Sequence, residues 1–419
     1  MKLPTKMKLP GGYAIDDRFW DREDDLRLFM HKISEGSHLL LVAQRRMGKT
    51  SLMLEAARRL QDRYLGLYVD LQQAFDAPDT IMRLGMATYE HKSLWGKVTS
   101  VFSNALASII EKIDKVSIFD VGIHLRSGLD SGNWSQKGDA LLSILAASEK
   151  PVLLMFDEIP IMVNRMLKGQ DYTITPERKR DVDEFMSWLR RNSIKHQGKI
   201  RMVLTGSIGF EPVLHQAGLS ATINTFQPFD LRPWDQITSI AYLHALACEY
   251  GIKFRDGAED EMVNRLGCCI PDHVRMFFSH VRDRCCRNDR CEFLRNEVAV
   301  VYEDEMLGTR GHAELTHYEE RLKMVLGLDL FPLALEMLSE AAITGYLSRE
   351  ALEALQSDYT FHQCTSVEAE TEILRVLEHD GYLRASPKGY VFVSYLVRDW
   401  CKKRYSLFFT SVLKRGRKS

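Results

Sequence analysis

The stretch that most constrains this chain is residues 38–54, HLLLVAQRRMGKTSLML. A short apolar run leads into a loop that ends Gly-Lys-Thr, and an apolar, helix-favouring segment follows. This order of strand, loop and helix is the context that a phosphate-binding loop requires, because the loop N–H groups wrap phosphates and the positive end of the helix points at them. The sequence therefore predicts a triphosphate-binding loop, and the alternative is a chance Gly-Lys-Thr at the start of a basic helix.

The loop residues have separate expected roles. Gly48 lets the backbone approach closely, Lys49 is placed to reach the β- and γ-phosphates, and Thr50 is placed to ligate Mg²⁺. The usual pattern begins with Gly, but Ala43 stands there, and Ala tolerates a positive φ less readily. The nucleotide-binding residues expected in this segment are Ala43, Gln44, Arg45, Arg46, Met47, Gly48, Lys49, Thr50 and Ser51.

A second apolar run, residues 152–158, ends in two carboxylates. Continuous apolar character is typical of a strand buried on both faces of a parallel sheet. Asp157 is positioned to hold Mg²⁺ through water, and Glu158 to polarise the attacking water. The alternative for both acids is an ordinary helix N-cap. Because this strand follows the phosphate loop in the expected order, we predict ATP and Mg²⁺ as cofactors.

Strand and helix patterns alternate from 39 to 230, which predicts an α/β fold with a parallel sheet. A strand at 64–70 ends in Asp70, and another at 200–207 ends in small polar residues, where the Ser207 hydroxyl either senses the γ-phosphate or only caps a turn. Helices are expected at 19–33, 79–115, 139–147 and 181–193. The pattern of 116–134 indicates a β-hairpin-like insertion.

The second half of the chain predicts helices. Residues 233–296 read as helical with a break at 266–271, and Arg275 after that break either reaches a nucleotide from a lid or is a solvated charge. Within 329–405, three helices and two short strands describe a winged helix. Residues 398–419 carry eight Lys or Arg against one acid, which marks a strongly basic end.

Length, net charge and the distribution of apolar residues limit the number of domains and the kinds of partner expected. A chain of 419 residues implies two or three domains. The formal net charge of -1 excludes a global basic field, so a nucleic-acid partner would need a local patch. No apolar run approaches the ~20 residues of a membrane span, and the N-terminus lacks a secretory apolar segment. We expect a cytoplasmic protein whose eight cysteines are reduced thiols rather than metal ligands.

In order, these motifs are W-D-R-E at 20–23, Q-R-R-M-G-K-T at 44–50, V-D-L ending a strand at Asp70, F-D-E at 156–158, L-T-G-S at 204–207, a Gly-x-x-x-Pro break and the C-terminal winged helix. The chain resembles the archaeal-type ATPases and, more broadly, the AAA+ and STAND ATPases related to origin-recognition proteins. The resemblance covers roughly residues 15–405 and matches 76–150 only in outline. Ala43 is its clearest departure.

The resemblance implies a P-loop AAA+-like parallel sheet with helices on both faces, a helical lid and a C-terminal winged helix. It also implies ATP binding, slow hydrolysis and a regulatory or DNA-contacting C-terminal domain. By this analogy Trp20, Asp21, Arg22 and Glu23 would flank the adenine, and Ser207 would sense the γ-phosphate. The domain boundaries expected are an arm at 1–12, a core at 13–232, a lid at 233–300, a linker helix and winged helix at 301–410, and a basic tail at 411–419.

Three functions remain open from the sequence. One is an ATP-dependent molecular switch, which needs an arginine finger in cis or from a neighbouring copy; Arg165, Arg190 and Arg191 are the candidates. Another is a DNA-binding module with a structural nucleotide, supported by the winged helix and basic tail. The third is a regulatory ATPase of a defence or mobile-element system, whose winged helix binds a protein effector encoded nearby. A homo-oligomer is compatible with all three.

Overall fold

The computed structural model describes residues 13–102, 118–361 and 364–415. Two compact units emerge from the contacts among these residues. The sheet unit comprises Arg22–Val42 and Lys49–Leu231, and the C-terminal unit comprises the described residues of Met1–Asp21, Ala43–Gly48 and Arg232–Ser419. The boundaries of the five segments expected from the sequence stay a prediction.

The sheet unit is built on a five-stranded parallel sheet, as the sequence predicts. The strand order is β2-β3-β4-β1-β5. Every residue of β3 is buried, which explains its continuous apolar character, since both faces of the sheet are covered. The strands are β1 His38–Val42, β2 Leu65–Asp70, β3 Val152–Asp157, β4 Ile200–Leu204 and β5 Phe226–Asp230.

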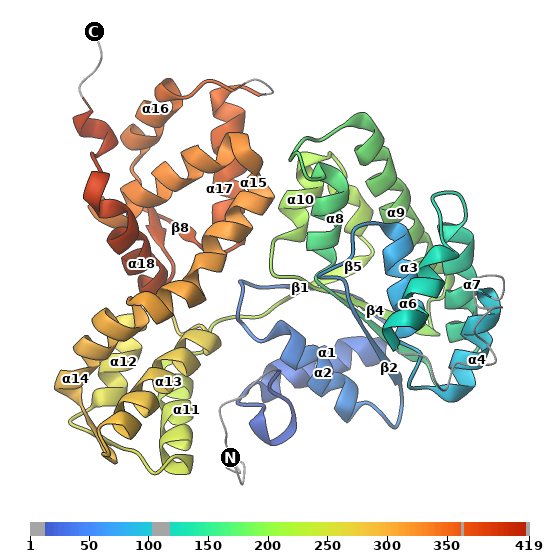
Figure 1. The fold of residues 1–419 in the computed structure, drawn as a ribbon, viewed down its shortest axis with the longest axis horizontal. Coiled ribbons are helices and arrows are strands. Elements are labelled where there is room, and N and C mark those ends of the chain that lie inside the picture. The colour runs from blue at the N-terminus through green and yellow to red at the C-terminus, as the bar shows by residue number, and fades with distance from the viewer. Residues whose placement is uncertain (1–12, 103–117, 362–363, 416–419) are drawn as a thin grey trace. The chain divides into compact units, whose positions relative to one another are not determined.

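Helices cover both faces of this sheet. Figure 1 shows α1 and α2 on one face and α8, α9 and α10 on the other. Leu26, Phe29 and Ile33 form the buried face of α1, which ends at Gly36 with a left-handed φ of 105°. The helices are α1 Glu23–Glu35, α2 Lys49–Arg59, α3 Ala77–Met86, α4 Lys92–Val101, α6 Ile118–Ser127, α7 Trp134–Ala146, α8 Ile159–Lys168, α9 Pro176–Lys195 and α10 Phe210–Gln216.

The segment 116–134 is helical where the sequence pattern indicated a β-hairpin. Residues 116–117 lie outside the described residues, and the rest forms α6 and a turn into α7. Val121, Leu125 and Leu129 are all buried and recur at helical spacing. The hairpin prediction is therefore wrong, because a short apolar segment can satisfy a period of two and a helical period at once.

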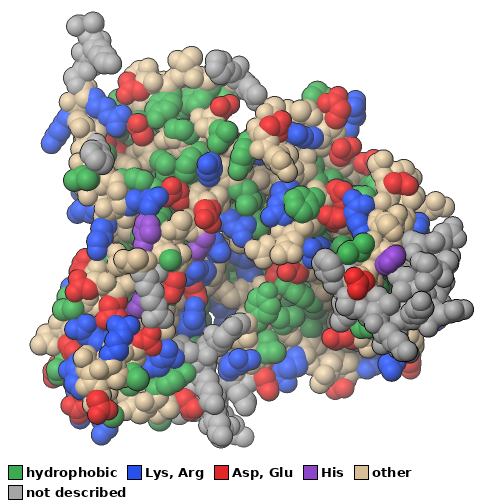
Figure 2. Space-filling view, viewed as in Figure 1, with side chains coloured by type: hydrophobic (Ala, Val, Ile, Leu, Met, Phe, Trp, Pro, Cys, Tyr) green, Lys and Arg blue, Asp and Glu red, His purple; other side chains and the backbone are tan. Residues whose placement is uncertain are grey.

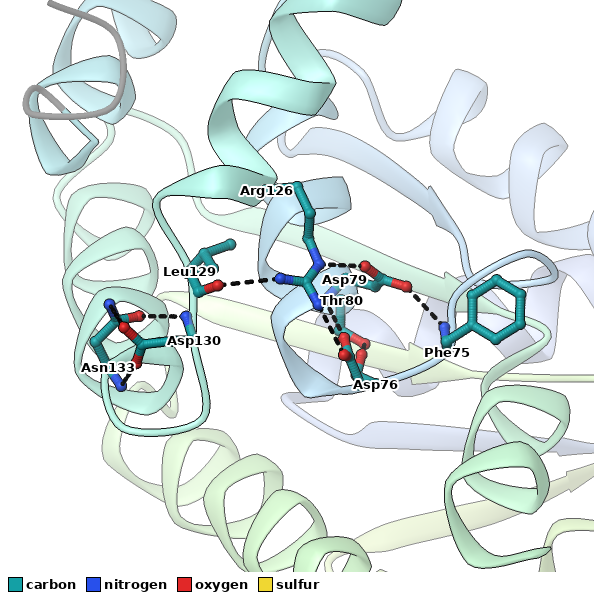
Figure 3. Close-up of polar contacts among 8 residues, drawn as sticks. All are labelled: Phe75, Asp76, Asp79, Thr80, Arg126, Leu129, Asp130 and Asn133. Atoms are coloured by element: carbon teal, nitrogen blue, oxygen red, sulfur yellow. Dashed lines mark hydrogen bonds and ion pairs between the residues drawn. The ribbon is translucent and has the colours of Figure 1, made fainter. Parts of the chain in front are cut away.

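Arg126 fixes α6 against the start of α3 (Figure 3). Its Nε donates to Asp79 Oδ1 at 2.6 Å, its Nη2 to Asp76 Oδ2 at 2.8 Å, and its Nη1 to the Leu129 carbonyl at 3.0 Å. Asp76 also caps α3 by accepting from the Asp79 N–H at 2.8 Å. One guanidinium thus holds two carboxylates, a tertiary contact that no local pattern encodes.

Within the C-terminal unit, residues 233–300 are not helical throughout. Two three-residue strands, β6 Lys253–Arg255 and β7 Glu292–Leu294, pair in parallel, so the prediction of helix alone over 233–296 is wrong there. Strands this short leave no periodic signal. The predicted break is confirmed, and Gly267 adopts a φ of 67° at it. The helices are α11 Gln236–Glu249, α12 Ala258–Leu266, α13 Pro271–Arg287 and α14 Arg295–Val300.

Residues 301–405 contain the expected helices and hairpin. A π-helical segment, Val301–Met306, precedes α15, Thr309–Thr344, which is interrupted at Gly327 (φ 75°). Ser348 caps α16 by accepting from the Ala351 N–H at 3.1 Å. The remaining elements are α16 Arg349–Asp358, α17 Ser366–His379, the antiparallel strands β8 Leu383–Ser386 and β9 Gly389–Phe392, and α18 Tyr395–Tyr405. That this arrangement is a winged helix stays a prediction.

Over the described ranges, none of the helices combines the length and the apolar character needed to cross a membrane.

Candidate nucleotide-binding site

Residues 43–48 form the turn between β1 and α2. Gly48 has a φ of 88°, which favours glycine, and Arg46 a φ of 66°. Ala43 is not among the residues with positive φ, so alanine in place of the usual glycine adds no backbone strain. Helix α2 begins at Lys49, a buried residue that is 7% exposed. The unpaired N–H groups of such a helix start carry a partial positive charge that suits a phosphate.

Asp157 lies at the end of β3 and accepts three hydrogen bonds. Thr50 Oγ1 donates to its Oδ2 at 2.6 Å, the Tyr68 hydroxyl donates to the same oxygen at 2.9 Å, and the Glu158 N–H donates to Oδ1 at 3.0 Å. The residue as a whole is only 4% exposed. Burial raises its pKa, although the hydrogen bond from Thr50 acts in the opposite direction. Asp157 is thus a desolvated carboxylate beside a hydroxyl.

This donor set fits Mg²⁺, which binds through hard oxygen atoms and retains several water ligands. The Thr50 hydroxyl and the Asp157 carboxylate are oxygen donors that already contact each other. A divalent cation beside Asp157 would also offset the cost of burying a negative charge there.

Glu158 is held toward the end of the neighbouring strand β4. Its Oε2 accepts from the backbone N–H of Ser207 at 2.8 Å and from Ser207 Oγ at 2.9 Å. The backbone of Glu158 has a φ of 58°, in the left-handed region that costs a non-glycine residue energy. Such a conformation at the end of a buried strand is typical of functional sites, where surrounding contacts hold a strained residue in place.

Gly206 permits this contact. A Cβ atom added there would lie 2.5 Å from Cδ of Pro160 and 3.5 Å from Oε2 of Glu158. The proline ring at the start of α8 cannot rotate away. A residue without a side chain is therefore required for Ser207 to reach Glu158.

Sequence reasoning missed Tyr68. It named Asp70 at the end of β2, but the Asp70 carboxylate accepts from the Gln72 N–H at 2.8 Å and so stabilises the turn after the strand. The hydroxyl that reaches Asp157 comes instead from Tyr68, two residues earlier. Only the pairing of β2 with β3 places this side chain there, and no motif in the sequence marks it.

The residues expected to flank the adenine divide between the two units. Trp20 belongs to the C-terminal unit, where its ring lies 5.7 Å from that of Tyr242. Arg22 and Glu23 belong to the sheet unit. The buried Arg22 pairs with Asp25 at 2.9 Å, and Glu23 pairs with Arg59 at 2.6 Å, a hydrogen-bonded contact that lowers the pKa of Glu23. Their role at a nucleotide stays a prediction.

The three candidate finger arginines differ in their surroundings. Arg165 donates to the carbonyls of Gln72 and Ala74, and its guanidinium lies 5.3 Å from the centre of the Phe75 ring. Arg190 is exposed on α9. Arg191 is also exposed and lies 3.6 Å from Asp139.

Two arginines that the sequence predicted to contact the nucleotide, Arg46 and Arg275, meet at one carboxylate in the C-terminal unit. Arg46 Nη1 lies 2.5 Å from Asp272 Oδ2, and Arg275 Nη2 lies 2.6 Å from Asp272 Oδ1. Burial opposes the charge of Asp272, but Arg46 and Arg275 outweigh it, so the pKa of this carboxyl is lowered. Sequence reasoning named both arginines and missed the acid between them.

Comparison with known proteins shows the fold. No protein-family model matches the chain, and no curated protein does. Among solved structures, the Walker-type ATPase PABY2304 of Pyrococcus abyssi is 16% identical with a TM-score of 0.61, covering 93% of this chain and 98% of its own. The ORC2 protein of Aeropyrum pernix, solved as ADPNP-ADP complexes, is 12% identical with a TM-score of 0.51, covering 94% of this chain and 98% of its own. The chain therefore shares the fold of this Walker-type ATPase and of this ORC2 protein.

Proposed function

We propose that this protein binds ATP with Mg²⁺, hydrolyses it slowly, and acts as a nucleotide-dependent switch. The observation that carries the proposal is the hydrogen bond between Thr50 and Asp157 at the carboxyl end of a parallel sheet, beside the buried Lys49. In open α/β sheets ligands bind at this edge. The fold shared with a Walker-type ATPase and with ORC2 supports the same function.

Each residue of the site has a role that its geometry supports. The loop N–H groups and Lys49 bind the phosphates, and Thr50 with Asp157 would hold Mg²⁺, which supplies charge neutralisation on the phosphates when bound. Glu158 orients and polarises the attacking water. Ser207 positions the Glu158 carboxylate through its two hydrogen bonds. In this proposal the same hydroxyl senses the γ-phosphate.

The grouping of the loop supports a switch. Residues 43–48 belong to the C-terminal unit, whereas β1 before them and α2 after them belong to the sheet unit. A ligand shifts a conformational equilibrium only through its different affinity for the two states, so the proposed switch requires ATP to prefer one arrangement of this loop.

Charge distribution favours a protein over DNA as the partner of the C-terminal unit. Three arginines of the basic stretch are paired within the unit: Arg398 with Asp399 at 2.7 Å, Arg404 with Glu319 at 2.9 Å, and Arg415 with Glu336 at 2.6 Å. Basic and acidic side chains are interspersed on the face shown in Figure 2. Helix α17, which a winged helix would present to a DNA groove, carries Glu368, Glu370, Glu372 and Glu378 against Arg375.

The DNA alternative has a direct test. If the basic stretch contacted duplex phosphates, log affinity would fall linearly with log salt, with a slope of about -0.9 for each neutralised phosphate. We expect a fluorescence-anisotropy titration of duplex DNA at several salt concentrations, with and without ATP, to show no such binding. A steep salt dependence would instead assign the C-terminal unit to DNA.

The nucleotide assignment is tested with Lys49→Ala. Loss of a cation on the β- and γ-phosphates should weaken binding of a fluorescent ATP analogue by at least about tenfold. Lys168→Ala is the matched control, because Lys168 is also a buried lysine of the sheet unit and lies at the end of α8. Equal affinity of wild type and Lys49→Ala would reject the phosphate loop.

A further inference from the structure

Arg46, a charged residue of the phosphate loop, forms an ion pair with Asp272 of the C-terminal unit. Arg46 Nη1 lies 2.5 Å from Asp272 Oδ2, in an ion pair rather than an aligned hydrogen bond. The side chains are 18% and 20% exposed, so the pair is largely shielded from water. Arg275 contacts the other oxygen of Asp272 through Nε at 2.9 Å and Nη2 at 2.6 Å. One carboxylate therefore serves two guanidinium groups.

Arg46 is also held by α15. Its Nη2 donates to the Glu314 carbonyl at 2.9 Å and contacts His317 Nδ1 at 3.4 Å. Burial, together with the charges of Arg46 and Arg45, lowers the pKa of His317 to about 2, so the imidazole is neutral and its Nδ1 can accept. The guanidinium is thus held by α13 and α15, while its own backbone stays in the left-handed region at φ 66°.

A second loop residue packs on the same unit. A Cβ atom added at Gly381 would lie 2.0 Å from Cδ of Gln44, so the Gln44 side chain rests against the backbone between α17 and β8. The described loop is therefore docked on the C-terminal unit by both Gln44 and Arg46.

Carboxylate and phosphate compete for the same guanidinium geometry. Arginine binds both anions through its planar fork of N–H donors, and a triphosphate carries more negative charge than one carboxylate. We propose that Asp272 is an internal competitor of the nucleotide: its carboxylate holds Arg46 in the nucleotide-free state, and the phosphates of bound ATP take Arg46 from it. This inference rests on the proposed function and adds the residue that sets the affinity and couples the loop to α13.

The test is ATP binding by Asp272→Asn, followed with a fluorescent ATP analogue. Because a competing anion is removed, the variant should bind about fivefold more tightly than wild type. Adenosine, which has no phosphates, should show no gain. Asp283→Asn is the matched control: Asp283 also lies on α13, is equally exposed at 20%, and pairs with Arg282 at 2.7 Å.

A double-mutant cycle separates competition from simple repulsion of phosphates by Asp272. If Asp272 acts through Arg46, the gain from Asp272→Asn should vanish in an Arg46→Gln background. A gain that persists there would overturn the proposal, as would equal affinity of wild type and Asp272→Asn. If neither protein binds ATP, the proposed function itself fails and the competition with it. Asp272→Ser, also compatible with the first turn of a helix, replaces Asp272→Asn if that variant does not fold.

Discussion

Acidification should destabilise this protein through His273, a histidine with no exposed surface. Its Nε2 contacts the Tyr318 hydroxyl at 3.1 Å and its Nδ1 contacts Ser394 Oγ at 3.5 Å. Burial lowers its pKa from 6.5 to about 4; Asp272 acts to raise the value and Arg46 to lower it. The folded state therefore keeps this imidazole neutral at pH values where the unfolded chain binds a proton.

The sign and size follow from proton linkage. Since the pKa is lower in the folded state, the stabilisation is fully present above pH 6.5 and is lost as the pH falls from 6.5 towards 4. Each pKa unit corresponds to about 1.4 kcal/mol, so His273 alone should account for about 3 kcal/mol over this range. Carboxylates and other histidines titrate in the same range, so only a comparison between variants isolates this contribution.

The assay is urea unfolding followed by tryptophan fluorescence at several pH values between 7 and 4. His273→Gln should be less stable at pH 7 because it packs less well, but its free energy of unfolding should fall less steeply on acidification, by about 3 kcal/mol over the range. His244→Gln, which removes an exposed histidine of the same unit, is the control. Parallel pH dependences for wild type and His273→Gln would refute the reasoning.

Three further predictions concern the sheet unit. Glu158→Gln should bind ATP but release no phosphate under saturating ATP, because an amide cannot polarise water as a carboxylate does; turnover at the wild-type rate would remove Glu158 from catalysis. Gly206→Ala should lose about 1–3 kcal/mol of stability in a thermal melt, because the new Cβ would meet the Pro160 ring at 2.5 Å; an unchanged melting temperature would contradict the packing. Arg126→Ala should speed proteolysis of α6 by freeing it from α3, and an unchanged cleavage pattern would count against the role of its ion pairs.

Continuous apolar runs in the sequence were sufficient to predict the central strands of the sheet unit. The apolar runs that became β1, β3 and β4 are continuous because both faces of a parallel sheet are covered. Capping residues also predicted helix ends correctly: Ser348 caps the start of α16, and Gly36 ends α1. These features depend on residues close in sequence, so they can be predicted from the sequence without the tertiary fold.

Predictions failed where local patterns were ambiguous or too short. The segment that became α6 fits two periods, and in the folded chain Arg126 of this helix contacts Asp76 and Asp79 at the start of α3. Strands β6 and β7 span three residues each and exist only because they pair with each other. No window of sequence contains both partners.

For the candidate site, the sequence alone determined which residue types are present: a glycine at a position needing positive φ, Lys49 and Thr50 at a helix start, and two acids ending a buried strand. The tertiary structure decided how they are joined. Parallel pairing brings Tyr68 to Asp157 and Ser207 to Glu158. The tertiary contacts also group loop residues 43–48 with the unit that contains Asp272, more than two hundred residues away along the chain. Such contacts depend on the meeting of distant segments, which local propensity and spacing do not encode.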